Sequence, residues 1–200
     1  MKVLLLEASE SLLEERRRRG LDRRDEVWEG VYHMVPPLTN EHQRIVDGLH
    51  FLFTGYFLKH DLGTVRSCIG IRDVRGADAN YRVPEWFAVR AGREALLHDE
   101  SSYVDEGPDV VVEVRSPGDE TDEKIPFYEA AGAGEVLIVD RDTRRPEVWR
   151  RSGKKLAPVS PGTDGWLYCE GLKAFFRAGE REGRPVLRVL LELDKTEHLI

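Results

Sequence analysis

The sequence predicts an α/β (α+β) fold in which helices flank a central mixed β-sheet and additional antiparallel strands follow. An apolar strand pattern, a helix pattern and a second apolar strand pattern succeed one another between residues 109 and 140. A long amphipathic helix pattern precedes this unit, and short strand patterns follow it. Because 40% of the 200 residues are hydrophobic, the chain can enclose one substantial core.

Composition limits the classes of function. The charged fraction of 34% is typical of a water-soluble chain, and no apolar run approaches the roughly 18 residues of a membrane helix. Glu7 interrupts the apolar stretch Met1–Leu6, so we expect no secretory signal and a cytoplasmic protein. The net charge of -7 gives no general attraction to nucleic acid, so such a function must depend on a local site or a bound metal. Cys68 and Cys169 are too few for a disulfide framework or a zinc site, and both are predicted to be buried thiols.

The N-terminal part predicts a helix and a hairpin. Helix formers fill Ser9–Arg19 and Gly20 follows as a stop, so residues 1–24 are predicted to be an N-terminal helical segment. The segment Val27–Val35 is rich in β-branched and aromatic residues, is broken at Gly30 and ends at Pro36 and Pro37. It is predicted to open a single domain that covers residues 25–200 and includes the C-terminal strands.

The middle of the chain contains the clearest elements. A long helix is predicted between a capping Thr39 and Gly63, because one apolar stripe recurs at helical spacing. A short helix is predicted over Glu123–Ala131, where Pro126 lies in the first turn. The strands predicted for the central sheet are Thr64–Arg72, Tyr81–Arg90, Asp109–Ser116 and Glu135–Asp140. The remainder predicts strands at Pro146–Arg151, Lys155–Val159, Gly165–Cys169 and Val186–Leu193, around a small helix near Leu172–Phe176.

Two carboxylates and one lysine form the candidate site. Glu113 lies at the end of an apolar strand, and Glu85 enters another strand after Pro84, so pairing of these strands can bring the two acids together. Converging carboxylates favour Mg²⁺, with Mn²⁺ as an alternative. Lys124 follows Glu113 by 11 residues, enough for the next helix to fold back, and Tyr128 shares its helix face.

Five motifs occur in an order that resembles the Uma-type putative restriction endonuclease family, a bacterial branch of the PD-(D/E)XK nuclease superfamily. The similarity covers roughly residues 25–150, and a GEVLIVD stretch follows the last motif. The motifs are EVWEG at Glu26–Gly30, EHQ at Glu41–Gln43, YRVPE at Tyr81–Glu85, VVEVRSP at Val111–Pro117 and K-x-x-x-Y at Lys124–Tyr128.

The resemblance implies a restriction-endonuclease-like fold, DNA as the substrate and a homodimer that cuts two strands. It implies that Glu85 and Glu113 bind the metal with the carbonyl of Val114, and that Lys124 completes the catalytic trio. Glu85 departs from the family's aspartate by one methylene. The resemblance further assigns supporting or substrate-binding positions to Glu26, His42, Gln43, Arg115, Ser116 and Tyr128.

Several alternatives remain open at this stage. A nuclease fold with little or no catalysis could serve as a module for nucleic-acid binding or protein interaction, and the same trio could hydrolyse another phosphate ester. His42 shares a helix face with Ile45 and Leu49, so a packed core histidine is as compatible with the pattern as an active-site one. The segment 141–155 carries seven basic and two acidic residues, a local charge of +5. It fits a surface that tracks phosphates or a soluble hairpin whose charges discourage edge pairing.

Overall fold

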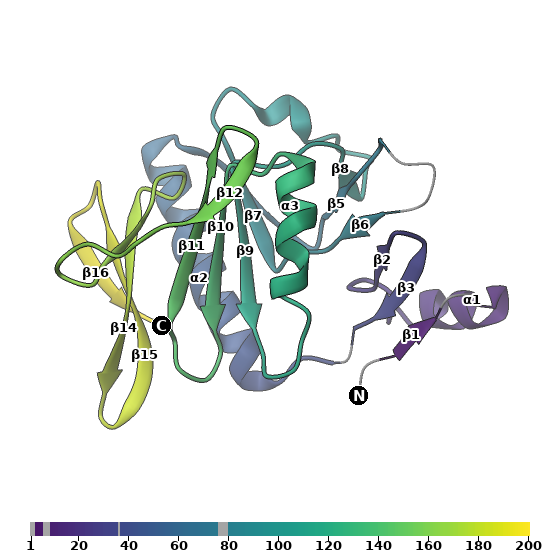
Figure 1. Ribbon diagram of the computed structural model, residues 1–200, viewed down its shortest axis with the longest axis horizontal. Coiled ribbons are helices and arrows are strands. Elements are labelled where there is room, and N and C mark those ends of the chain that lie inside the picture. The colour runs from purple at the N-terminus through teal and green to yellow at the C-terminus, as the bar shows by residue number, and fades with distance from the viewer. Residues whose placement is uncertain (1–2, 6–8, 36, 76–79) are drawn as a thin grey trace.

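Three β-sheets lie side by side in the structure, a computed structural model that describes residues 3–5, 9–35, 37–75 and 80–200 (Figure 1). Met1, Leu6, Glu7 and Pro36, which entered the predictions above, lie outside the described residues. None of the helices in the described ranges combines the length and the apolar character that a bilayer crossing needs.

The central sheet is mixed, as the sequence predicts. Its strand order is β12-β11-β10-β9-β7-β4, with β9 and β10 parallel and every other pair antiparallel. The strands are β4 (Gly63–Ser67), β7 (Trp86–Arg90), β9 (Val110–Arg115), β10 (Glu135–Asp140), β11 (Pro146–Ser152) and β12 (Lys155–Pro158). The predicted fold class is therefore confirmed.

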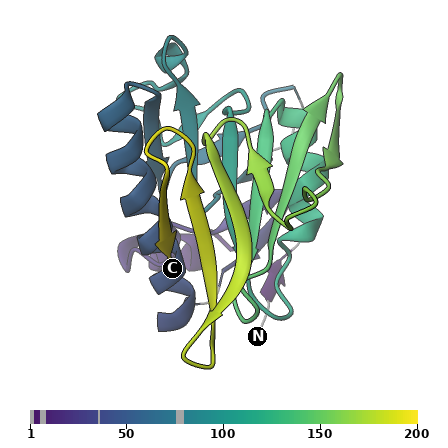
Figure 2. The ribbon, with the colours of Figure 1, turned by 90° about the vertical axis from the view of Figure 1, so that its left-hand side faces the viewer.

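Two helices cover opposite faces of the central sheet (Figure 2). Helix α2 (Asn40–His60) packs on one face, and its N-cap Thr39 accepts a hydrogen bond from the His42 amide. Helix α3 (Ile125–Ala131), preceded by the 3-10 turn η2 (Asp122–Lys124), packs on the other. Because side chains alternate along a strand, Val112 of β9 joins the core under α2, whereas Val111 joins the core under α3. The same alternation directs Glu113 to the α3 face.

The N-terminal sheet has the order β1-β3-β2-β6-β5-β8. Its strands are β1 (Val3–Leu5), β2 (Glu26–Trp28), β3 (Val31–Met34), β5 (Gly70–Arg72), β6 (Tyr81–Arg82) and β8 (Tyr103–Val104). The β2–β3 hairpin turns at Glu29 and Gly30, which both have positive φ, as a type I′ hairpin turn requires. Helix α1 (Glu10–Arg18) precedes β2, and the short 3-10 turn η1 (Glu94–Leu96) precedes β8. Because β1 pairs with β3, the predicted boundary at residue 24 separates two partners of one sheet, and the division stays a prediction.

In the C-terminal sheet, part of a strand lies where the sequence predicted a small helix. It is formed by β13 (Leu167–Cys169), β14 (Ala174–Arg181), β15 (Arg184–Leu191) and β16 (Thr196–Leu199), in that order. The small helix predicted near Leu172–Phe176 is wrong, because Leu172, Ala174 and Phe176 are buried while the residues between them are half-buried. This period of two is that of a strand, and β14 pairs with β13 and β15.

Two predicted strands are each divided between two sheets. The chain passes from β4 to β5 through Cys68, whose φ of 58° breaks the strand, and from β6 to β7 through Val83, Pro84 and Glu85. The predictions of continuous strands over Thr64–Arg72 and Tyr81–Arg90 were therefore wrong. Glu85 consequently lies at the crossover between the N-terminal and central sheets instead of inside a strand.

The two cysteines differ in exposure. Cys169 is buried as predicted, but Cys68 is exposed because it occupies the break between β4 and β5. We expect an aromatic disulfide reagent to modify one thiol per native chain rapidly and the second only after unfolding in guanidinium. The measurement is the released chromophore with time, and Cys68→Ser should abolish the rapid phase. Rapid reaction of both thiols in the native protein would contradict the assignment.

Candidate active site

A pocket of about 300 Å³ lies where the N-terminal sheet meets the central sheet. Strand β2 supplies Glu26, the β6–β7 crossover supplies Glu85, and the end of β9 supplies Glu113. Lys124 enters from η2, and His42 enters from the first turn of α2. The three residues predicted to form the trio thus line one pocket.

The ammonium of Lys124 lies between two buried carboxylates. Its Nζ is 2.9 Å from Oε1 of Glu26 and 3.1 Å from Oε1 of Glu113, and each of these acids is 2% exposed. The Lys124 side chain is itself only 14% exposed. The burial that would lower the lysine pKa is outweighed by these two negative charges, which raise it. Lys124 therefore stays protonated at neutral pH.

The loop after β9 brings Lys124 back to the strand end. Asp119 accepts hydrogen bonds from the backbone amides of Ser116 and Thr121, and Gly118 between them has a φ of 74°. The compact turn leads directly into η2, whose last residue is Lys124. One helical turn later, the buried hydroxyl of Tyr128 donates to Oε1 of Glu113. The predicted common face of Lys124 and Tyr128 is therefore the face that covers Glu113.

Glu113 is buried and lies close to several charged side chains. Burial, together with the nearby charges of Glu85 and Glu26, raises the pKa of Glu113 to about 7, although Lys124 and the Tyr128 hydroxyl oppose this. Its Oε2 accepts no hydrogen bond from the described residues, in contrast to Oε1. One oxygen of Glu113 is therefore fixed by the protein and the other is open to the pocket.

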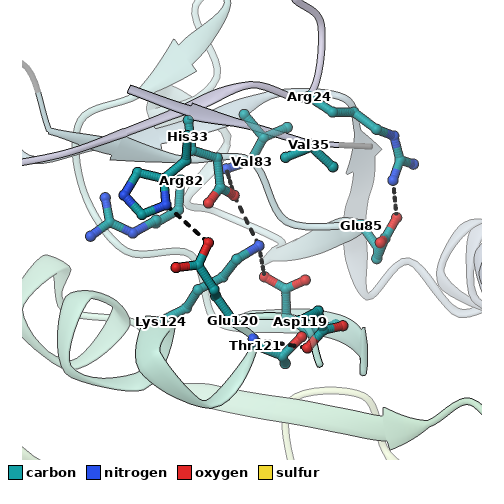
Figure 3. A network of polar contacts seen from close by, with 12 residues as sticks. Arg24, His33, Val35, Arg82, Val83, Glu85, Asp119, Glu120, Thr121 and Lys124 are labelled. Carbon is teal, nitrogen blue, oxygen red and sulfur yellow. Dashed lines mark hydrogen bonds and ion pairs between the residues drawn. The ribbon is translucent and has the colours of Figure 1, made fainter. Parts of the chain in front are cut away.

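Glu85 is held from two sides. His42 Nε2 lies 2.7 Å from Oε1. Arg24 Nη1 donates to Oε2 over 2.7 Å, as Figure 3 shows. His42 is only 3% exposed, and its Nδ1 lies 2.9 Å from the Ser116 hydroxyl, so it links α2 to the loop after β9. Burial raises the pKa of Glu85, but His42 and Arg24 lower it by more. The histidine is thus both packed and part of the pocket, which joins the two interpretations left open by the sequence.

Two of the predicted supporting residues lie elsewhere. Gln43 donates to Asp47 on the exposed side of α2, and Arg115 pairs with Asp122 and Glu147. Neither lines the pocket. Gln43 follows His42 on α2, and adjacent residues of a helix point in different directions. Arg115 lies on the same side of β9 as Glu113, but its guanidinium pairs with Asp122 and Glu147, which do not line the pocket.

Sequence reasoning missed several pocket residues. Arg24 lies between α1 and β2, and His33 of β3 stacks on Trp28. Nδ1 of His33 lies 2.9 Å from Oε2 of Glu120 (Figure 3). The indole of Trp28 also donates to Oε2 of Glu26 over 2.8 Å. The EVWEG motif contains Glu26 and Trp28, but nothing in it indicates the partners of either side chain, since Glu120 is 87 residues away from His33.

Comparison with known proteins places the chain in a family. The model of the Uma2 family, described as "Putative restriction endonuclease", matches residues 10–178. The chain belongs to the Uma2 family. This confirms the resemblance carried by the five motifs. No curated protein matches the chain.

A solved structure has a similar fold. It is a crystal structure entitled a putative nuclease belonging to DUF820 from Anabaena variabilis ATCC 29413, and it superposes with a TM-score of 0.59 at 15% sequence identity. The match covers 74% of this chain and 82% of the other. At this identity the likeness establishes a shared fold.

The oxygen atoms of this Uma2 protein's pocket suit a magnesium ion. Among the described residues no three or more His, Cys, Asp or Glu side chains are grouped to hold a metal. Mg²⁺, however, commonly takes one or two carboxylates and keeps several waters. The Arg115 carbonyl accepts from Arg141 on the β10 side, so the preceding Val114 carbonyl points toward β7, whose pairing with β9 ends at Val112. That carbonyl, Oε2 of Glu113 and Glu85 are hard donors, so the residues present fit the ion.

The basic segment 141–155 is mostly engaged in internal contacts. Arg150 binds Glu135, Lys155 binds Glu129, and Arg144 binds Glu41. Arg151 donates to the carbonyls of Ala133 and Glu129, and Arg141 pairs with Asp142. These contacts favour the structural interpretation of the segment over a surface that tracks phosphates.

Removal of the Lys124 charge should destabilise the fold. We expect Lys124→Met to lower the free energy of unfolding by about 3–5 kcal/mol at pH 8, because it leaves Glu26 and Glu113 buried without their cation. Urea denaturation measures the change. Lys155→Met is a matched control, since that side chain is 81% exposed in its ion pair and should cost less than about 1 kcal/mol. Equal effects of the two substitutions would contradict the central role of Lys124.

Proposed function

We propose that this Uma2 protein is a Mg²⁺-dependent endonuclease that hydrolyses phosphodiester bonds in DNA. In this proposal Glu85, Glu113 and Lys124 are the catalytic trio, and the Val114 carbonyl assists the two acids in holding the metal. The observation that carries it is the Lys124 ammonium, fixed 3.1 Å from Glu113 at the end of β9 in a pocket that also contains Glu85. Membership of a family described as restriction endonucleases supports the choice of substrate.

In this proposal each residue of the site has a separate role. When bound, Mg²⁺ or Mn²⁺ would supply Lewis-acid stabilisation of the charge that develops on the phosphate. Lys124 has three N–H donors, of which Glu26 and Glu113 take two, so the third remains to bind a phosphate oxygen or to orient the attacking water. Tyr128 holds Glu113 in place, and the Val83 amide and Trp28 indole hold Glu26. The ammonium is therefore preorganised before substrate arrives.

A second candidate is a nuclease fold that binds nucleic acid or protein with little or no catalysis. Its support is that both oxygens of Glu85 are already bound by His42 and Arg24. A cation must compete with these groups. The expected homodimer stays a prediction for either candidate, because the contacts above lie within one chain.

Plasmid nicking separates the two candidates. We expect the wild type to nick supercoiled plasmid with Mg²⁺ or Mn²⁺, and Glu113→Gln to lower the rate on the order of 100-fold or more, because an amide loses the charge that binds the metal. Lys124→Ala should have a similar effect. Glu123→Gln is the matched control, because Glu123 is exposed beside Lys124 and should be neutral. A wild type as inert as its variants, with binding retained, would favour the non-catalytic module.

Metal affinity should depend on pH through Glu113. A pKa of about 7 means that a proton occupies the carboxylate below neutral pH, and a cation must displace it. We expect the apparent Mn²⁺ affinity, measured by calorimetry, to fall by about tenfold per pH unit below pH 7 and to level off above it. Glu113→Gln should bind weakly with little dependence on pH. A wild-type affinity that is constant between pH 6 and 8 would contradict the role of this group.

A further inference from the structure

The two groups that hold Glu85 differ in how firmly they are fixed. His42 is buried and binds Ser116 as well as Oε1 of Glu85. Arg24 is 30% exposed, and among the described residues its guanidinium forms one hydrogen-bonded ion pair, to Oε2 of Glu85. Departure of Arg24 would therefore leave the Glu85 carboxylate in place, with Oε2 open to the pocket.

The backbone beside Arg24 is anchored independently of its side chain. The next residue, Asp25, is 1% exposed and binds the guanidinium of Arg16 through both oxygens, at 2.6 and 2.7 Å. Asp25 also accepts from the Tyr32 hydroxyl over 2.6 Å and from the Val35 amide over 3.0 Å. The guanidinium of Arg24 can therefore change its partner without movement of the chain.

Lys124 differs from Arg24 in its exposure and in the acids that it neutralises. It is half as exposed as Arg24, and its departure would leave Glu26 and Glu113 buried without a cation. Arg24 neutralises one acid that keeps a second partner in His42. Of these two cations in the pocket, Arg24 is the one that an incoming positive charge can displace.

We propose that Arg24 takes the place of the divalent metal at Glu85 in the metal-free protein, and that metal binding releases its guanidinium to bind a phosphate group of the substrate. The proposal rests on the nuclease function proposed above and adds a substrate-binding residue to it. A guanidinium presents parallel N–H donors that suit phosphate oxygens as well as carboxylates, so the same group serves both partners.

The exchange couples the two ligands. Metal binding frees Arg24 for phosphate, and phosphate binding withdraws Arg24 from Glu85, so each ligand increases the affinity of the other by the same factor. Without the arginine, metal should bind more tightly and the coupling to substrate should be lost. Tighter metal binding together with lost coupling distinguishes a residue that occupies the position of the metal from one that merely stabilises the pocket.

Calorimetry with Mn²⁺ on the metal-stripped full chain tests the first effect. We expect Arg24→Gln to bind Mn²⁺ about tenfold more tightly than the wild type, which corresponds to the loss of one charge-assisted hydrogen bond that the metal must otherwise break. Arg141→Gln is the matched control, because it removes the same charge from the same pocket while its partner is Asp142. Arg24→Lys keeps the charge and should stay near the wild type. Thermal unfolding of each variant verifies that it is folded.

Anisotropy of a fluorescein-labelled DNA duplex, in EDTA and in Ca²⁺, tests the second effect. We expect Ca²⁺ to tighten duplex binding at least tenfold in the wild type and in Arg141→Gln, and several-fold less in Arg24→Gln. An Mn²⁺ affinity of Arg24→Gln that equals or falls below that of Arg141→Gln would overturn the proposal, as would unchanged tightening by Ca²⁺.

The outcome is separable from that of the nuclease proposal. If the wild type nicks plasmid while Arg24→Gln shows neither effect, the proposed role of Arg24 is wrong and the nuclease function stands. If Arg24→Gln shows both effects while no variant nicks DNA, the proposed role of Arg24 stands and the proposed catalysis is wrong.

Discussion

The ammonium of Lys124, shared between Glu26 and Glu113, is the interaction on which the rest of the site depends. Each acid comes from a different sheet, and each is 2% exposed. Without this cation, two buried carboxylates would repel each other, and neutral hydrogen-bond donors alone would have to compensate for their lost hydration. The lysine therefore joins the N-terminal sheet to the central sheet, and it holds together the elements that enclose the pocket.

The pocket exists because the chain crosses between these sheets. The β6–β7 crossover carries Glu85, which lies away from the regular pairing of either sheet and so reaches both α2 and the segment before β2. Strand β9 extends beyond its pairing with β7, which leaves Glu113 and the Val114 carbonyl at a free edge. Irregular backbone at the junction of two sheets thus creates a cavity that contains charged side chains beside two hydrophobic cores.

Negative charge exceeds positive charge among the buried side chains of the pocket. Burial, together with the charges of two neighbouring acids against the opposing charge of Lys124, raises the pKa of Glu113 to about 7. A divalent ion would relieve the repulsion and favour the ionised carboxylate. A histidine and an arginine likewise compensate the charge of Glu85.

The sequence by itself determined the central elements, because a buried strand, an amphipathic helix and a tight turn have local patterns: β9, β10, α2 and the β2–β3 hairpin follow them. Spacing and family resemblance also selected Glu85, Glu113 and Lys124, which line one pocket. Only the tertiary structure decided that Cys68 and Glu85 interrupt strands, that residues 174–176 extend a sheet, and that Arg24 faces Glu85 across 61 residues. The reason is physical: strand pairing and ion pairing join residues that are distant in the sequence, and neither produces a repeating pattern of residues along the chain.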